Sequence, residues 1–302
     1  GAPFDYAAGT IEPDVGQPFA DGVAHLEMIS WTKNGLYDTT GKRVFKTTQV
    51  YGKVRRFFDG RAAAKPDGYT LGGLSQSALT IVPHVQKDVS FTLQSFAPIA
   101  CLVESPILLV AKADGPWKNL KEMVAEAKSK PGQINFTTAG TYNIGHIAFE
   151  AFAKRAGIKM NFIPSQGSAP SITAVLGGHV HLASAAIVPA LPHIQAGTLR
   201  ALAVYSANRV AALPDAPTFE EMGYPVVIPV YYGFIAPKST PKEVIEKLYL
   251  ATQKVVENHG DFVNERLSKM GARRIFIGTG EYANLLKSQY EYYGELIRGI
   301  KP

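Results

Sequence analysis

The sequence predicts an α/β fold with a largely parallel sheet, and two patterns point to it. From about residue 69, short apolar runs alternate with longer segments of helical periodicity, as in chains built from strand–helix units. Two such units are complete within residues 136–152 and 162–178. The chain has 302 residues, of which 46% are hydrophobic, so it can form two domains with cores of their own.

The first unit is a strand, a glycine-bracketed turn and a helix. Ile134 and Phe136 alternate with polar neighbours, which is the period of a strand, and five apolar residues then recur at helical spacing: Ile144, Ile147, Ala148, Ala151 and Phe152. The start of a helix presents unsatisfied N–H groups and the positive end of its dipole. We therefore expect the turn at 140–145 to face an anionic group.

The second unit places Gln166, Gly167 and Ser168 in a turn before a short helix. If both units belong to one parallel sheet, both helix starts open at its carboxyl edge, where open α/β folds bind ligands. Further helix starts are predicted at Asn119, Thr218 and Thr240, each of which has a glutamate three residues later. At the last of these, Pro241 is expected to be the first helical residue.

Composition excludes several classes of protein. The net charge of +6 comes from scattered residues, so we expect no nucleic-acid partner. No run of 18 apolar residues occurs, and the first residues lack a signal-peptide pattern, so the chain is either cytosolic or has lost its signal peptide. The single Cys101 rules out an internal disulfide and is expected to be buried.

Catalytic and metal motifs are incomplete. Gly140 and Gly145 have phosphate-loop spacing, but no lysine follows them. His179 and His181, two apart on a predicted strand, could bind a metal with His193, but neither a carboxylate nor a cysteine lies nearby in sequence. We therefore expect no cofactor and no metal.

A serine nucleophile is the alternative to a pure binding site. Ser75 resembles the nucleophile of a strand–helix elbow, but a serine, Ser77, stands where the second glycine should be. A soluble hydrolase acting on a carboxylate substrate through Ser75 or Ser77, with a distant histidine, is thus the competing hypothesis. A serine lining a pocket accounts for the same residues.

Several stretches together resemble one family. They are KPDGYTL (65–71), TTAGTYNIGH (137–146), QGSAPSITAVLGGHVHL (166–182), LPHIQAGTLRALAV (191–204), LPDAPTFEEMGYP (213–225) and GFIAPKSTPKEV (233–244). In order and spacing they are similar to the periplasmic solute-binding receptors of tripartite tricarboxylate transporters, also called Bug receptors, over residues 65 to about 300.

The resemblance implies a type II periplasmic binding protein: two α/β lobes joined by two crossing strands, with the ligand cleft between them. Lobe one would hold residues 1–103 and 232–302, and lobe two residues 104–231. Such a receptor is a noncatalytic, periplasmic monomer whose signal peptide has been removed. It captures an organic carboxylate and delivers it to the membrane components of the transporter. The small residues at 183–187 favour an aromatic carboxylate.

The resemblance also implies that backbone N–H groups of strand–helix turns hold the carboxylate. The ligand-binding residues expected from it are Phe19, Ala20, Asp21, Gly22, Ser75, Gln76, Ala139, Gly140, Thr141, Tyr142, His146, Gln166, Gly167, Ser168, Ala183 and Ser184. One region departs from the family. Residues 18–26 have the expected spacing but few of the expected residue types, and Leu26 replaces an aspartate. Either this loop has diverged or the residue identities there contain errors.

Overall fold

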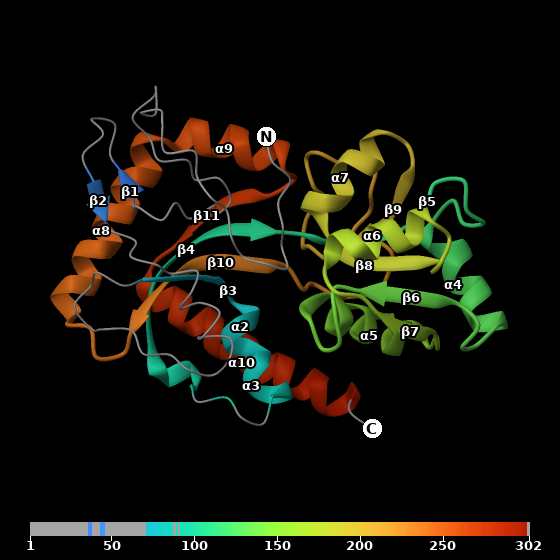
Figure 1. Ribbon diagram of the computed structural model, residues 1–302, viewed down its shortest axis with the longest axis horizontal. Coiled ribbons are helices and arrows are strands. Elements are labelled where there is room, and N and C mark those ends of the chain that lie inside the picture. Colours follow the sequence, from blue (N-terminus) through green and yellow to red (C-terminus); the bar gives the residue numbers. More distant parts are fainter. Residues whose placement is uncertain (1–35, 38–42, 46–70, 87–88, 90, 301–302) are drawn as a thin grey trace. The chain divides into compact units, whose positions relative to one another are not determined.

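The computed structural model describes residues 36–37, 43–45, 71–86, 89 and 91–300 (Figure 1). Strands β1 (Leu36–Tyr37) and β2 (Arg43–Phe45) pair antiparallel. The chain divides into two compact units: unit 1 contains residues 1–102, 233–263 and 276–287, and unit 2 contains residues 103–232, 264–275 and 288–302. The lobe boundaries and crossing strands expected from the sequence stay predictions.

Unit 1 is organised around a four-stranded sheet with the order β11-β4-β10-β3. Several of its elements continue into unit 2. In chain order the elements are β3 (Gly72–Ser75), α2 (Ser77–Thr80), α3 (Val82–Val85), the 3-10 helix η1 (Leu93–Ser95), β4 (Phe96–Ser105), β10 (Val230–Pro237), α8 (Lys242–Asn258), α9 (Gly260–Lys269), β11 (Arg273–Ile277) and α10 (Thr279–Ile300). Cys101 lies fully buried on β4, as predicted.

Unit 2 contains a five-stranded sheet with the order β7-β6-β8-β5-β9. Its elements are β5 (Ile107–Lys112), α4 (Leu120–Ser129), β6 (Asn135–Thr138), α5 (Ile144–Ala156), β7 (Asn161–Pro164), α6 (Ser168–Leu176), β8 (Leu182–Ala186), α7 (Ile187–Gln195) and β9 (Leu199–Val204). The α/β class is confirmed, and β6 is parallel to β7 and β8. The sheet is nevertheless mixed, because β5 is antiparallel to both β8 and β9. An apolar run does not reveal strand direction, which depends on the connections.

The two faces of this sheet pack differently. Helices α6 and α7 cover one face and α5 lies on the other (Figure 1). Toward α6 and α7 the core is aliphatic and includes Leu108, Val110 and Ala183. Against α5 the core is aromatic, and Phe136 stacks on Phe149 with ring centroids 3.7 Å apart. Successive residues of a strand point to opposite faces, so each strand contributes to both cores.

Of the predicted helix starts, the one at Asn119 is confirmed and the one at Thr218 is wrong. Asn119 caps α4 as expected, because its Oδ1 accepts the N–H of Glu122 at 3.0 Å. Thr218 and Glu221 form both bonds of a capping box, at 3.0 and 2.8 Å, yet the helix prediction there is wrong. The chain makes only a turn, because Gly223 adopts φ +85° and Pro225 follows.

Two further local predictions are wrong. The helix expected after Thr240 is confirmed as α8, but its predicted cap is wrong: the helix begins at Lys242 with Pro241 as its N-cap, and the Thr240 hydroxyl is buried without a hydrogen-bond partner. Strand β8 begins at Leu182, so His179 and His181 precede the strand rather than lie on it. Among the described residues, no helix combines the length and hydrophobicity that crossing a bilayer requires.

Candidate functional site

Three helices of unit 2 begin at one edge of its sheet. The parallel strands β7, β6 and β8 end in register, with Thr138 paired to both Pro164 and Ser184. Each strand leads directly into a helix, α5, α6 or α7. The prediction that the first two turns share one carboxyl edge is confirmed, and the Ser165 N–H donates to the Thr138 carbonyl at 3.1 Å. Three positive dipole ends thus favour an anion at this edge, although at α7 the Ile187 N–H already donates to the Pro106 carbonyl at 3.1 Å.

Side chains brace the first turn. The Thr138 hydroxyl donates to the Gly140 carbonyl at 2.8 Å. Asn143 is the N-cap of α5, and its Oδ1 accepts the N–H of His146 at 2.8 Å. Nδ1 of His146 accepts the N–H of Tyr142 at 3.0 Å. Tyr142 has φ +56°, and among the described residues no other non-glycine residue has a positive φ.

Gly145 allows the first turn of α5 to lie against β8. A Cβ added there would lie 2.6 Å from the Ser184 carbonyl oxygen, which is closer than real Cβ contacts come. The sequence signal for this requirement was present, because Gly145 was one of the two glycines that bracket the predicted turn. Its role is the close approach of helix and strand rather than phosphate binding.

Several polar groups at this turn have no hydrogen-bond partner among the described residues. The N–H groups of Thr141, Ile144 and Gly145 belong to the turn and to the first helical residues, where intrahelical acceptors are missing. The buried side-chain atom Asn143 Nδ2 is likewise unpaired, whereas the buried Ser184 Oγ lies near the Tyr205 hydroxyl without meeting the geometry of a hydrogen bond. Ser184 is only 1% exposed. Buried polar groups normally find partners, so this part of the molecule has unused hydrogen-bonding capacity.

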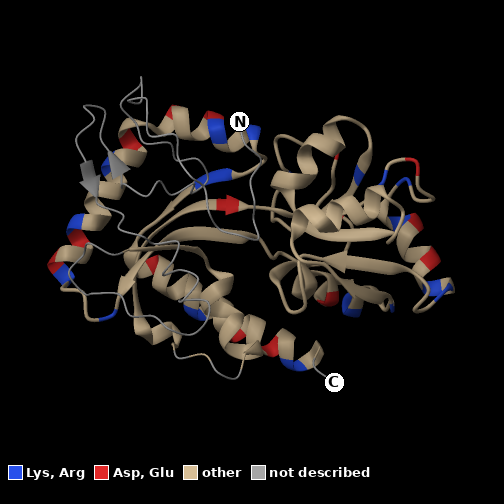
Figure 2. Ribbon diagram, viewed as in Figure 1, with Lys and Arg blue, Asp and Glu red and all other residues tan. Residues whose placement is uncertain are grey.

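A buried tyrosine lies behind Ser184. Burial raises the pKa of the Tyr205 phenol, and the nearby Ser184 hydroxyl opposes the rise. Charged side chains are absent from β6, β8 and the turns at 139–143 and 165–168, and Figure 2 shows β6 and β8 without charge. The edge can therefore attract an anion through amide and hydroxyl groups rather than through Lys or Arg.

The second turn depends on glycine rather than on side-chain caps. Gly167 is the N-cap of α6 with φ +127° and no side-chain cap bond. Its carbonyl accepts both the Ser171 N–H at 3.1 Å and the Ser171 hydroxyl at 2.9 Å. The N–H groups of Ser168 and Ala169 lie in the first turn of α6, where the helix offers them no acceptor.

The remaining predicted residues belong to β8, to unit 1 or to the part of the chain that the structure does not describe. Ala183 belongs to the aliphatic core under α6 and α7, whereas its neighbour Ser184 faces the α5 side of the sheet. Ser75 ends β3 in unit 1, where its hydroxyl pairs with that of Ser77, and Gln76 beside it is fully buried. Phe19, Ala20, Asp21 and Gly22 lie outside the described residues.

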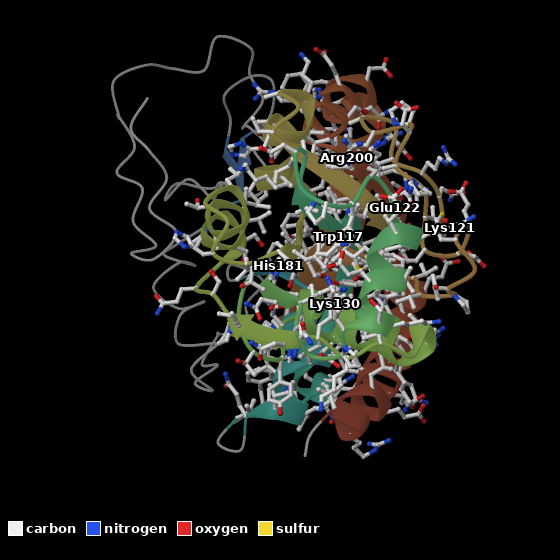
Figure 3. All side chains as sticks on the ribbon, turned by 90° about the vertical axis from the view of Figure 1, so that its right-hand side faces the viewer. Trp117, Lys121, Glu122, Lys130, His181 and Arg200 are labelled. Atoms are coloured by element: carbon white, nitrogen blue, oxygen red, sulfur yellow. The ribbon has the colours of Figure 1, made fainter. Side chains whose placement is uncertain are left out.

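The histidines considered for a metal have other contacts. Nδ1 of His181 accepts the N–H of Asn135 at 2.9 Å, and its ring lies 6.2 Å from that of Trp117. Figure 3 labels Trp117, Lys130 and His181 in this part of unit 2. Within the part of the chain that the structure describes, no group of three or more His, Cys, Asp and Glu side chains is placed to hold a metal.

The indole of Trp117 takes part in a hydrogen-bond network with Glu126 and Lys130 that the sequence did not predict. Its Nε1–H donates to Glu126 at 2.7 Å, and Lys130 donates to the same carboxylate at 2.9 Å. These bonds, from Lys130 first and then from Trp117, lower the pKa of Glu126. The contacts join the segment before α4 to the helix, which is a structural role.

Comparisons with known proteins agree with the motifs. Residues 59–301 match the family described as tripartite tricarboxylate transporter family receptor. A protein of Bordetella pertussis from the group named UPF0065 is 34% identical over 193 residues, which cover 64% of this chain and 60% of that protein, less than two thirds of its length. BugT of the same organism is 28% identical over 287 residues, which cover 93% of this chain and 86% of BugT.

The fold comparison points the same way. A TctC solute-binding protein from Polaromonas superposes with a TM-score of 0.69 at 25% identity, covering 86% of this chain and 87% of that one. The family match begins after residues 18–26, so both explanations of that departure stay open. From its sequence motifs, its fold and the match over residues 59–301, the chain belongs to the receptor family of the tripartite tricarboxylate transporters.

Proposed function

We propose that this receptor binds an organic carboxylate at the carboxyl edge of β6, β7 and β8 and delivers it to the membrane components of its transporter. The observation that carries the proposal is the shared edge at which α5, α6 and α7 begin, with unpaired N–H groups in the first two turns. The buried Asn143 Nδ2, which has no hydrogen-bond partner among the described residues, is an independent indication, because a buried donor without a partner needs a ligand or water.

The chemistry suits a carboxylate better than a neutral solute. A hydrogen bond to an ionised acceptor is worth about twice a neutral one. The turns at 139–143 and 165–168 contain no charged residue, so their amides can hold an anion without a competing carboxylate. Gly140, Thr141, Gln166, Gly167 and Ser168 are the residues we assign to this contact.

The part of the ligand beyond its carboxylate is less defined. The prediction of an aromatic acid rested on the small side chains at 183–187. However, Ala183, Ala185 and Ile187 are buried in the aliphatic core. They provide no room for the ligand, so the proposal covers organic carboxylates as a class. Ser75, Gln76 and the loop at 19–22 stay predicted contacts from the family resemblance.

Binding without catalysis is the second part of the proposal. The Ser75 hydroxyl pairs with Ser77 rather than with a histidine, which does not favour the hydrolase alternative. The family description names a receptor. By the same reasoning we propose a periplasmic monomer that acts after removal of a signal peptide.

Mass spectrometry and calorimetry test this function. Native mass spectrometry of the purified protein should detect a co-purified acid, and titration with citrate, adipate, glutamate, nicotinate and benzoate should show one site for at least one of them. The acid should be recovered chemically unchanged after long incubation. Turnover of the acid beyond stoichiometric amounts would support the hydrolase, and failure of both the panel and the co-purified material to bind would contradict the receptor.

A further inference from the structure

We propose that His146 is the positioning residue of the carboxylate turn: its Nδ1 holds the Tyr142 N–H and so makes ligand affinity depend on pH. The inference rests on the proposed function for its effect on the ligand, but the geometric role of His146 can be tested without any ligand. It concerns how the turn keeps its shape, which the sequence reasoning did not address, since it placed His146 among the ligand contacts.

The turn needs an acceptor at this position. Tyr142 adopts a left-handed backbone conformation that a bulky residue rarely occupies without support. The Nδ1 atom of His146 satisfies the amide of that residue at 3.0 Å. In turn, the His146 N–H is satisfied by Asn143, so the three residues form a closed set of contacts from side chain to backbone. Thr141, whose N–H has no partner among the described residues, lies immediately before Tyr142.

The imidazole itself is held rigidly. His146 is 5% exposed, and its ring stacks on Phe162 of β7 with centroids 4.0 Å apart and planes at 13°. The ring of Phe136 on β6 lies 6.1 Å away, and that of Tyr142 5.8 Å away. A buried ring that stacks on Phe162 has little freedom to turn, so its Nδ1 keeps one direction. The sheet residue Phe162 therefore fixes the position of Nδ1, and Nδ1 in turn fixes the conformation of the turn at Tyr142.

The hydrogen bond determines which nitrogen carries the proton. Because Nδ1 accepts from Tyr142, neutral His146 must carry its proton on Nε2, which lies 3.7 Å from Oε1 of Glu150. A second proton can be added only at Nδ1, and it would replace the acceptor with a donor facing the Tyr142 N–H. Protonation is thus coupled to opening of the turn.

This coupling determines whether affinity for the ligand rises or falls with pH. The open turn binds one more proton than the closed turn, so acidification favours the open form and weakens ligand binding. Two titratable side chains lie close to the ring: Glu150 on α5, and Tyr142 in the turn. The Glu150 carboxylate lies on the Nε2 side of the ring, and Phe136 and Phe162 contribute no charge. The measurement therefore spans about pH 5 to 8, over which histidine as a residue type changes charge.

Two substitutions separate the acceptor from the ring. His146→Phe keeps an aromatic ring against Phe162 but has no acceptor, whereas His146→Asn loses the ring but keeps an oxygen near the position of Nδ1. Residue-resolved hydrogen exchange of the Tyr142 amide in ligand-free protein is the first readout. The protection factor should fall about fivefold to tenfold in His146→Phe, as expected for one hydrogen bond, and stay within about threefold of the parent in His146→Asn.

Calorimetry across pH is the second readout, with the tightest-binding acid of the panel above as the probe. From about pH 8 to pH 5 the parent should lose affinity about tenfold or more, while His146→Asn should be nearly flat after correction for titration of the probe itself. A structural role in packing alone predicts the reverse ranking, with Phe tolerated and Asn not. Equal Tyr142 protection in the parent and His146→Phe would overturn the proposal. Loss of protection with unchanged affinity would support the positioning role and overturn the assignment of this turn as the ligand site.

Discussion

The two strand–turn–helix units of unit 2 end at the same sheet edge but are built differently. In the first, side chains of Thr138, Asn143 and His146 satisfy backbone groups of the turn. In the second, Gly167 takes a φ of +127° and no side chain caps the helix. The first turn keeps its shape through specific side-chain bonds, and the second through a backbone conformation that glycine favours.

The difference predicts how each turn responds to substitution. Side-chain bracing uses some of the amides of the first turn, including that of Tyr142, and leaves a smaller set for a ligand. The second turn uses few side chains, so changes around it should matter only when they disturb its backbone. Substitutions can test both statements, and those with the largest expected effects are described first.

A fixed negative charge in the first turn should have the largest effect on binding. Thr141→Asp should reduce affinity for the bound acid by about two orders of magnitude or more, because the ligand loses charge-assisted bonds of about 1.5–3 kcal/mol each and meets a like charge. Stability should change little, since aspartate near a helix N-terminus is favourable by roughly 0.3–1 kcal/mol. Titration calorimetry and a thermal melt separate the two effects.

Thr198→Asp is the matched control for that substitution. Thr198 is also exposed in unit 2, but its hydroxyl donates to the His193 carbonyl at 3.0 Å, near the end of α7. A negative charge there should lower stability slightly, by roughly 0.3–1 kcal/mol, and leave affinity unchanged. If Thr141→Asp melts normally and still binds within threefold of the parent, the first turn does not hold the carboxylate.

The contact of α5 with β8 should be the most sensitive point for stability. Gly145→Ala should cost about 1–3 kcal/mol, because the new Cβ would lie 2.6 Å from a backbone carbonyl that cannot easily move. Gly280→Ala is a matched control, since Gly280 is also the second residue of its helix and an added Cβ meets nothing within 4 Å. Chemical denaturation should show the control unchanged or stabilised by up to about 1 kcal/mol. Equal stability of both variants would contradict the close approach.

Much of this edge could be predicted from the sequence. The alternation around Phe136 and the helical spacing from Ile144 to Phe152 gave the correct elements, because one face of each is buried in a core. The start of α7 carries no such signal, as its N-cap is Ala186 without a capping side chain. The start of this third helix, and its place at the edge, were therefore found only in the structure.

Other features depend on contacts between distant residues. The antiparallel direction of β5 follows from its pairing with β8 and β9, and an apolar run does not encode it. At Thr218 the sequence predicted the local contact correctly but not the element. The capping bond forms, but Gly223 ends the turn before a helix can form. His146 was predicted as a ligand contact, whereas its bond to Tyr142 depends on where Phe162 places the ring.

Removing the N-cap of α5 should have an intermediate effect. Asn143→Ala should destabilise the protein by about 0.5–2 kcal/mol, because the His146 N–H loses its acceptor at the helix start. Asn143→Asp keeps an acceptor and should retain most of the stability, but its charge should weaken binding of an acid. Thermal melts and calorimetry on the two variants measure these effects. A neutral result for Asn143→Ala would mean that the first turn does not depend on side-chain bracing.

The smallest effect is expected in the second turn. Ser171→Ala removes the hydroxyl that donates to the Gly167 carbonyl at 2.9 Å, a bond worth about 0.5–1.5 kcal/mol. Two factors offset the loss: the same carbonyl still accepts the Ser171 N–H at 3.1 Å, and alanine has the higher helix propensity by about 0.5 kcal/mol. Ser171 is fully buried, so the substitution removes a polar atom from the core without creating a large cavity. The net change in the free energy of unfolding should stay within about 0.5 kcal/mol, and affinity for the acid should be unchanged. A loss comparable to that of Asn143→Ala would show that side chains brace both turns, and the contrast between the two units would then be wrong.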